Sequence, residues 1–129
     1  MANMEIEGIG QIHITVDDID RAVAFYRDVL GLPLLFQVPE QSMAFFDCGG
    51  VRLYLGRAEA DGLVSRPLLY YRVPDIGGAW ERLQELDVPA VEPPHVVHRS
   101  AETELWLASV EDPEGTTICL MEERAVVDS

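Results

Sequence analysis

The sequence predicts an α+β protein built from two β-α-β-β-β units whose curved mixed sheets form an open cavity. The first observation is an internal repeat, in which a strand-like segment leads into an amphipathic stretch and a turn; its copies begin at His13 and Tyr70. The second is that both halves close with a glycine-led strand, which begins at Gly50 and at Gly115. A repeat of this length cannot cover its own apolar face. Two facing copies therefore enclose a space in which function is to be sought.

The first unit is predicted to span residues 6–58. Apolar and polar residues alternate over residues 11–16, which predicts a strand with one apolar and one polar face. Apolar residues at helical spacing over 19–30 predict a helix, with Asp18 as its N-cap and Gly31 as its stop. Three short strands complete the unit, at about 34–38, 42–48 and 51–56.

The second unit is predicted to span residues 67–124, after a short polar linker. A strand over 68–73 precedes a helix over 76–86, for which Asp75 is the predicted N-cap. The second copy is longer than the first, and the surplus falls around residues 96–104, where we expect an inter-strand loop that forms a rim or lid. The remaining strands are predicted near 95–99, 104–110 and 116–122.

The composition sets the class of protein. The chain has 129 residues, 48% of them hydrophobic, as expected for one globular domain. It shows no membrane-spanning run and no secretory signal, so we expect a cytoplasmic protein with reduced cysteines. The net charge of -14 argues against nucleic acid and anionic membranes as partners. It favours a cationic ligand, unless it simply confers solubility.

The strand faces that point away from the predicted helices mix polar, aromatic and thiol groups. Such a face is typical of a semi-polar cavity wall, although an antiparallel sheet also commonly turns one face to solvent. Tyr54 and Tyr70 favour the cavity, because their rings favour partial burial. The candidate residues on these faces are Gln11, His13, Arg52 and Tyr54 in the first unit, and Tyr70, Arg72, Cys119 and Met121 in the second.

Several motifs carry a resemblance to a known family. They are His13 on the first strand, Phe25-Tyr26 within the first helix, Gly31-Leu32 at its end, and Asp112-Pro113-Glu114-Gly115 before the last strand. With these motifs and the repeat, the chain resembles the vicinal oxygen chelate superfamily, from about residue 6 to 122. That superfamily includes glyoxalase I, fosfomycin-resistance thiol transferases, extradiol dioxygenases and bleomycin-resistance binding proteins. The resemblance implies the glyoxalase/bleomycin-resistance fold, a small-molecule ligand and a homodimer.

The resemblance also implies where a metal ion would be held. Metal-dependent members place ligands on the first and last strands of each unit, and here those positions are His13, Tyr54, Tyr70 and Cys119. Only His13 fits, because tyrosine is a poor ligand for zinc, nickel or manganese, and cysteine suits only a soft or borderline ion. We therefore expect no metal cofactor at this position.

A second constellation stays open in the longer region of the second unit. His98 and Glu104 flank the predicted hairpin. They are interpreted as a rim pair or as unrelated surface residues, unless their side chains point inward. In that case His13, His98 and Glu104 would form a metal site or an acid–base group. Trp106, on the same strand as Glu104, is a further candidate ligand contact.

Two functions are compatible with these residues. The first is a glyoxalase-like lyase or isomerase acting on a small carbonyl, carboxylate or thioester compound, with an incomplete metal site. His13 would act as its base or ligand, Tyr54 and Tyr70 as hydrogen-bond donors or stacking walls, and Arg72 as anion partner. Cys119 would be a nucleophile only if its pKa were lowered. The alternative is a binding protein that sequesters a drug or antibiotic without converting it.

Overall fold

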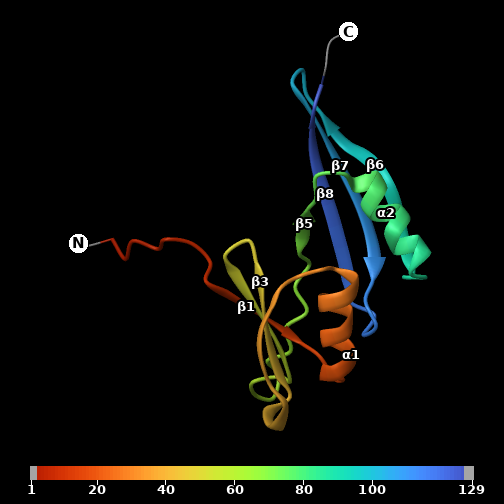
Figure 1. Ribbon diagram of the computed structural model, residues 1–129. Coiled ribbons are helices and arrows are strands. Elements are labelled where there is room, and N and C mark those ends of the chain that lie inside the picture. The colour runs from red at the N-terminus through yellow and green to blue at the C-terminus, as the bar shows by residue number, and fades with distance from the viewer. Residues whose placement is uncertain (1–2, 127–129) are drawn as a thin grey trace. The chain divides into compact units, whose positions relative to one another are not determined.

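The computed structural model describes residues 3–126, which fall into two compact units. The first ends at Arg66 and the second begins at Pro67. Each unit holds one four-stranded sheet, and the strand orders are β1-β4-β3-β2 and β5-β8-β7-β6 (Figure 1). In both sheets the first strand of the unit lies at one edge and pairs in parallel with the last strand, and the other pairs are antiparallel. The predicted α+β fold with repeated β-α-β-β-β units is confirmed.

The first unit follows its predicted order closely. A π-helical turn, Phe25–Val29, continues α1, so the predicted helix is present with a widened last turn. A 3₁₀ turn, Pro39–Gln41, connects β2 to β3. The other elements are β1 (Gln11–Thr15), α1 (Ile19–Ala24), β2 (Leu34–Val38), β3 (Met43–Cys48) and β4 (Val51–Gly56).

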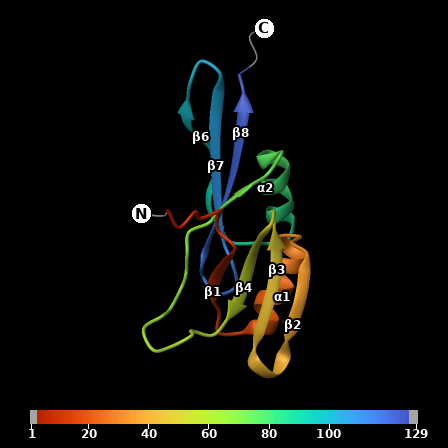
Figure 2. The ribbon, with the colours of Figure 1, turned by 90° about the vertical axis from the view of Figure 1, so that its left-hand side faces the viewer.

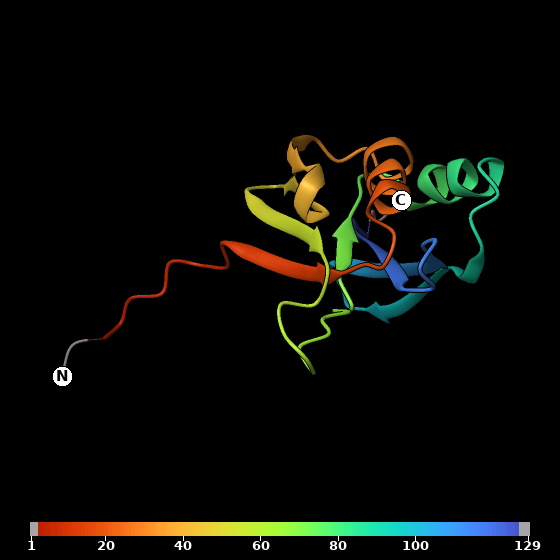
Figure 3. The same ribbon diagram turned by 90° about the horizontal axis from the view of Figure 1, so that it is seen from below.

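One face of the first sheet packs against α1, as Figure 3 shows. Alternation along the strands turns Ile14, Phe46 and Leu53 to this side, and all are at most 2% exposed. Tyr26 from the helical segment is 1% exposed and its ring centroid lies 6.0 Å from that of Phe46. These apolar contacts form the core of the unit and leave the opposite sheet face free of helices.

The outer edge of β1 is not open, because the linker returns to it. The Thr15 amide donates to the Ser65 carbonyl at 2.7 Å, and the Ser65 amide donates to Oγ1 of Thr15 at 2.8 Å. The Ser65 hydroxyl donates to the His13 carbonyl at 2.6 Å. The predicted polar linker is thus tied to the sheet, and it caps an edge that would otherwise expose unpaired backbone groups.

The second unit departs from its prediction in the longer hairpin. Its elements are β5 (Tyr70–Arg72), α2 (Ile76–Glu85), β6 (Ala90–Arg99), β7 (Thr103–Glu111) and β8 (Thr117–Ala125). The surplus residues do not form a loop but lengthen β6 and β7, whose hairpin extends past α2 in Figure 2. The β6–β7 register shifts repeatedly near Pro93 and Pro94, which cannot donate to the ladder and are tolerated on this edge strand.

The predicted caps are present. Asp18 accepts from the Arg21 amide at 3.2 Å, and Asp75 accepts from the Gly78 amide at 3.1 Å. Gly31 ends the first helical segment with φ 73°, a conformation that favours glycine. Within the described residues, neither helix has the length and apolar character needed to cross a membrane.

Candidate functional site

A row of aromatic rings crosses the helix-free face of the first sheet. Its members lie opposite one another on neighbouring strands: Phe36 on β2, Phe45 on β3, Tyr54 on β4 and His13 on β1. Ring centroids are 4.4 Å apart for Phe36 and Phe45, and 4.8 Å apart for Phe45 and Tyr54, with nearly parallel planes. The His13 ring follows at 4.6 Å from Tyr54, tilted by 45°. We call these four residues the ring row.

The ring row differs in exposure from one end to the other. Phe45 and Tyr54 are 9% and 7% exposed, whereas Phe36 at the β2 end is 47% exposed. Stacked rings cover one another's faces, so the row presents ring edges and the outer face of Phe36 to a ligand. Aromatic edges carry partial positive charge and favour contact with the face of another ring.

A polar row lies one step along the strands from the rings. Arg52 is opposite Gln11 on β1 and opposite Asp47 on β3. Nε of Arg52 donates to Oε1 of Gln11 at 2.8 Å, and the guanidinium carbon lies 5.8 Å from the Phe45 ring centroid. Asp47 is turned to the β3–β4 turn, where its carboxylate accepts from the Gly50 amide at 3.1 Å. The face therefore combines an aromatic floor with one oriented cation.

Tyr54 owes its position to a glycine. A Cβ atom at Gly56 would lie 2.7 Å from Cε1 of Tyr54, so the ring leans over the space that this glycine leaves. Burial raises the pKa of Tyr54, and the nearby Glu59 carboxylate adds to the effect. The phenol therefore stays protonated at neutral pH and can donate a hydrogen bond.

His13 has one ring nitrogen with no partner. Its Nε2 is buried, and no hydrogen-bonding group of residues 3–126 reaches it. A buried polar atom without a partner is uncommon and is costly unless a ligand or water serves it. The atom is available on this face to form a hydrogen bond with a ligand.

The second unit brings its predicted residues together in pairs. On its helix-free face, Tyr70 lies opposite Cys119 and Arg72 lies opposite Met121, across the parallel strands β5 and β8. Arg72 also borders an open hollow of about 570 Å³ with Val73, Pro74, Glu122 and Glu123. Whether this face and the ring row contribute to one cavity stays a prediction.

The burial of Cys119 works against a nucleophilic role. It is a free cysteine, 8% exposed, and burial raises the pKa of its thiol. A reactive cysteine needs the opposite shift, which a neighbouring cation or base would provide. The thiol is neutral at physiological pH and is one of the side chains of the helix-free face.

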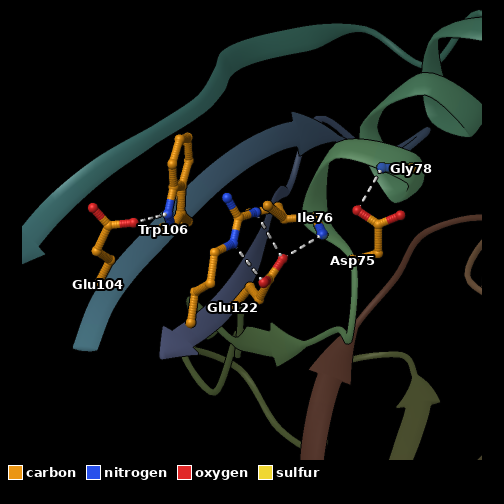
Figure 4. Close-up of polar contacts among 7 residues, drawn as sticks. Asp75, Ile76, Gly78, Glu104, Trp106 and Glu122 are labelled. Atoms are coloured by element: carbon orange, nitrogen blue, oxygen red, sulfur yellow. Dashed lines mark hydrogen bonds and ion pairs between the residues drawn. The ribbon is translucent and has the colours of Figure 1, made fainter. Parts of the chain in front are cut away.

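Glu104 and Trp106 lie on the other face of the second sheet, which is a correction to the expected ligand contacts. They are opposite Arg124 and Glu122 on β8, and Glu122 reaches the start of α2 on that face. Figure 4 shows Nε1 of Trp106 donating to Glu104, at 3.3 Å. The Arg124 guanidinium carbon lies 4.5 Å from the Trp106 ring centroid. The indole is thus covered by this chain's own side chain.

His98 and Glu104 do not meet across the hairpin. His98 lies opposite Leu105, and Glu104 lies opposite Arg99, whose guanidinium binds its carboxylate. Because successive residues on β7 point to opposite faces, the two side chains are separated by the sheet. The expected group of His13, His98 and Glu104 required both His98 and Glu104 to point to the same side, so this group is not supported. His98 is an exposed residue of the hairpin.

The donor groups at the family's metal positions do not fit a divalent ion. His13 is a suitable ligand, but tyrosine is a poor ligand for zinc, nickel or manganese, and burial raises the pKa of the Cys119 thiol, which makes its deprotonation for a metal ion more costly. Within residues 3–126, no three His, Cys, Asp or Glu side chains come close enough to hold a metal ion. We derive no chemical step from a metal at this position.

Sequence reasoning missed Phe36, Phe45 and Gly56 as parts of the site. Phe36 and Phe45 sit in apolar runs, Leu34-Leu35-Phe36 and Phe45-Phe46, where alternation does not tell one face from the other. The signal that could have found them is the antiparallel pairing of β2 with β3, which sets Phe36 opposite Phe45.

Comparisons with known proteins agree with this architecture. The model of the Glyoxalase/Bleomycin resistance protein/Dioxygenase superfamily matches residues 8–120. The chain is 30% identical over 98 residues to the uncharacterized protein YraH of Bacillus subtilis, which covers 66% of this chain and 77% of that protein. Metallothiol transferase FosB of Staphylococcus haemolyticus is 40% identical, but over 50 residues, 39% of this chain and 34% of that protein.

Two solved structures are similar over nearly the whole chain. A lactoylglutathione lyase from Agrobacterium tumefaciens is 26% identical with a TM-score of 0.71, covering 91% of this chain and 94% of that one. TnmS3, an antibiotic binding protein from Streptomyces sp. CB03234, is 25% identical with a TM-score of 0.72, covering 93% and 98%.

Proposed function

This chain belongs to the glyoxalase/bleomycin resistance protein/dioxygenase superfamily, and we propose that it binds a planar, aromatic small molecule and leaves it unchanged. The observation that carries the proposal is the ring row, which spans all four strands of the first sheet on its helix-free face. The likeness to the antibiotic binding protein TnmS3 supports the same function.

The ring row has the physical properties that such a ligand requires. Its apolar floor is fixed by cross-strand stacking, so little ordering is needed when a ligand binds. Phe36 is half exposed and leaves apolar surface to be covered. An aromatic pair adds about 0.5–1.5 kcal/mol beyond the area that it buries. The neutral Tyr54 phenol and the unpartnered Nε2 of His13 supply hydrogen-bonding groups at the other end of the row.

The proposal is tested with 2-naphthamide, a neutral planar probe, followed by ¹H–¹⁵N correlation spectra. We expect saturable shifts confined to β1–β4, recovery of the probe unchanged after long incubation, and about tenfold weaker binding in Phe36→Ala. Leu35→Ala is the matched control, because Leu35 is 50% exposed on the same strand but outside the ring row. No saturable binding, or equal binding by Phe36→Ala, would reject the proposal.

A glyoxalase-like lyase or isomerase is the second candidate, and the buried Nε2 of His13 favours it. An unpartnered imidazole nitrogen beside a protonated phenol can take a proton from a bound ligand while Tyr54 donates a hydrogen bond. Because the chain is similar to a lactoylglutathione lyase, S-lactoylglutathione is a suitable probe. Consumption of S-lactoylglutathione by the wild-type chain, and its loss in His13→Gln, would establish this activity. Recovery of unchanged S-lactoylglutathione would reject this activity.

The assembly state is a separate part of the proposal. The resemblance implies a homodimer, and a sedimentation-equilibrium mass near twice the chain's 14.4 kDa would support it. A concentration-independent monomer would reject the dimer without affecting the binding proposal.

A further inference from the structure

The ring row lies beside a cation that no acidic side chain of the described residues neutralises. We propose that the aromatic ligand carries a carboxylate, which the terminal nitrogens of Arg52 bind while its ring lies on the ring row. The inference rests on the proposed binding function, because it names the chemical class of ligand for the same face. It replaces the cationic ligand that the net charge of -14 favours.

Arg52 is held in place without losing its charge. Its Nε donates to the neutral amide oxygen of Gln11, which fixes the guanidinium and leaves both terminal nitrogens available. Among residues 3–126 it forms no ion pair, and the nearby Asp47 carboxylate is engaged by the Gly50 amide. Four of the other arginines among the described residues do pair with carboxylates: Arg27 with Asp28, Arg66 with Asp17, Arg99 with Glu104 and Arg124 with Glu122.

The identity of residue 11 decides this difference. Glutamate at the same place would accept the same hydrogen bond and also neutralise Arg52. Glutamine orients the planar guanidinium and keeps its full charge for a partner from outside. A guanidinium with two free parallel N–H groups matches a carboxylate, which it can bind through two hydrogen bonds.

The position of the guanidinium selects an aromatic acid over a simple anion. Its carbon lies 5.8 Å from the Phe45 centroid, so one small ligand can contact the ring row and Arg52 together. A chain with 23 acidic and 9 basic residues repels free anions at long range. An anion therefore needs the additional apolar contact of a ring to bind here.

The test compares 2-naphthoate with 2-naphthamide, which have the same ring system and differ in charge, by calorimetry at about 50 mM salt, where screening is weak. We expect wild-type protein to bind the carboxylate about tenfold more tightly than the amide. Gln11→Glu and Arg52→Gln should both abolish this preference, whereas Arg57→Gln should keep it and leave 2-naphthamide binding within about twofold of wild type. Arg57→Gln is the control, since Arg57 is an exposed arginine on the same unit for which no ion pair is formed among the described residues.

The outcomes separate the two proposals. If both probes bind equally, if the preference persists in Arg52→Gln, or if it disappears in Arg57→Gln, the carboxylate inference is wrong and aromatic binding stands. If neither probe binds, the aromatic binding proposal fails and the inference fails with it. Circular dichroism of each variant confirms that the fold is retained.

Discussion

The two units repeat one strand order but use their sheet faces differently. In the first unit the buried core of the helix-side face is apolar, and the ring row and Arg52 lie on the helix-free face. In the second unit the helix-side face carries a charged network, and no stacked rings are found on its described helix-free face. The two copies therefore share a backbone topology but not a chemistry.

The network in the second unit has a structural role. Oε1 of Glu122 accepts from the Ile76 amide at 2.9 Å, at the start of α2, as Figure 4 shows. A carboxylate at this end complements the helix dipole and satisfies an amide that has no partner within the helix. Arg124 binds the same carboxylate at 2.9 Å and covers Trp106. This arrangement anchors the helix to the sheet.

The difference between the two units indicates which side chains serve ligand binding and which serve stability. On the helix side of the second unit, Glu122 and Arg124 bind each other, whereas Arg52 and His13 of the first unit keep nitrogen atoms that have no hydrogen-bond partner among the described residues. Side chains with unused hydrogen-bonding capacity are the ones that can serve a ligand. Substitutions in the two regions should therefore change different measurements.

The largest expected effect comes from the two faces of the first sheet. Phe46 is fully buried against the helical segment, so Phe46→Ala should lower the free energy of unfolding by about 3–5 kcal/mol. Phe36→Ala, at a half-exposed site, should change it by less than about 1 kcal/mol while weakening the binding of 2-naphthamide. Urea unfolding measures the first effect. If Phe46→Ala does not fold, Phe46→Leu provides the same comparison, and equal stability losses at both sites would contradict the assignment of faces.

The next effect is the loss of the anchor in the second unit. The hydrogen bond from Arg124, with that from the Ile76 amide, holds the pKa of Glu122 below its usual range. A depressed carboxyl pKa stabilises the fold above the unfolded-state value and loses this effect as the pH falls through the folded-state value. Glu122→Gln should therefore lower the free energy of unfolding by about 1–3 kcal/mol at pH 7. The difference from wild type should shrink below about pH 4, where the carboxylate becomes protonated.

Glu123→Gln is the matched control for that measurement. Glu123 is exposed on the opposite face of β8, so its substitution should stay within about 0.5 kcal/mol of wild type at either pH. A Glu122→Gln deficit that is constant from about pH 7 to about pH 3 would show that the charge of this carboxylate does not stabilise the unit.

Local periodicity is enough to predict much of this fold. The strands Leu34–Val38 and Val51–Gly56 have the predicted bounds, and both aspartate caps are where the helix signals place them. Alternation over residues 11–16 also sets His13 and Gln11 on one face. These features depend on neighbours in sequence, which a pattern can report.

What could not be predicted depends on pairing between distant residues. The ring row needs the register of three strand pairs, and the Glu122 contact joins residues 46 apart. Pro93 and Pro94 are unfavourable within a strand, yet β6 continues through them at the edge of its sheet. The faces of Glu104 and His98 depend on the same kind of information, because the bulged register of β6 decides them.

Smaller effects on binding and on stability are expected at Gly56, whose missing side chain leaves room for the Tyr54 ring. A methyl group there would displace the Tyr54 ring, so Gly56→Ala should weaken 2-naphthamide binding several-fold and destabilise by about 1 kcal/mol. In a Tyr54→Leu background the same substitution should have little effect on stability, which a double-mutant cycle measures. Gly10→Ala is the control, since no atom lies within 4 Å of the place that its methyl group would take. An equal cost of Gly56→Ala in both backgrounds would refute the ring contact.

The smallest expected difference lies between the two helix caps, which occupy matching places in the repeat. Asp18 accepts from the Arg21 amide and Asp75 accepts from the Gly78 amide, both in the first turn of a helix. If the two caps were equivalent, the loss of either one would cost about 1 kcal/mol. They are not equivalent, because the Glu122 carboxylate also binds the start of α2. After Asp75→Ala that carboxylate still complements the helix dipole, so we expect this substitution to cost about half as much as Asp18→Ala. Urea unfolding of the two variants and of Asp75→Ala/Glu122→Gln measures the difference. The double variant should lose more than the two single variants together, and simple additivity would show that the two carboxylates stabilise α2 independently.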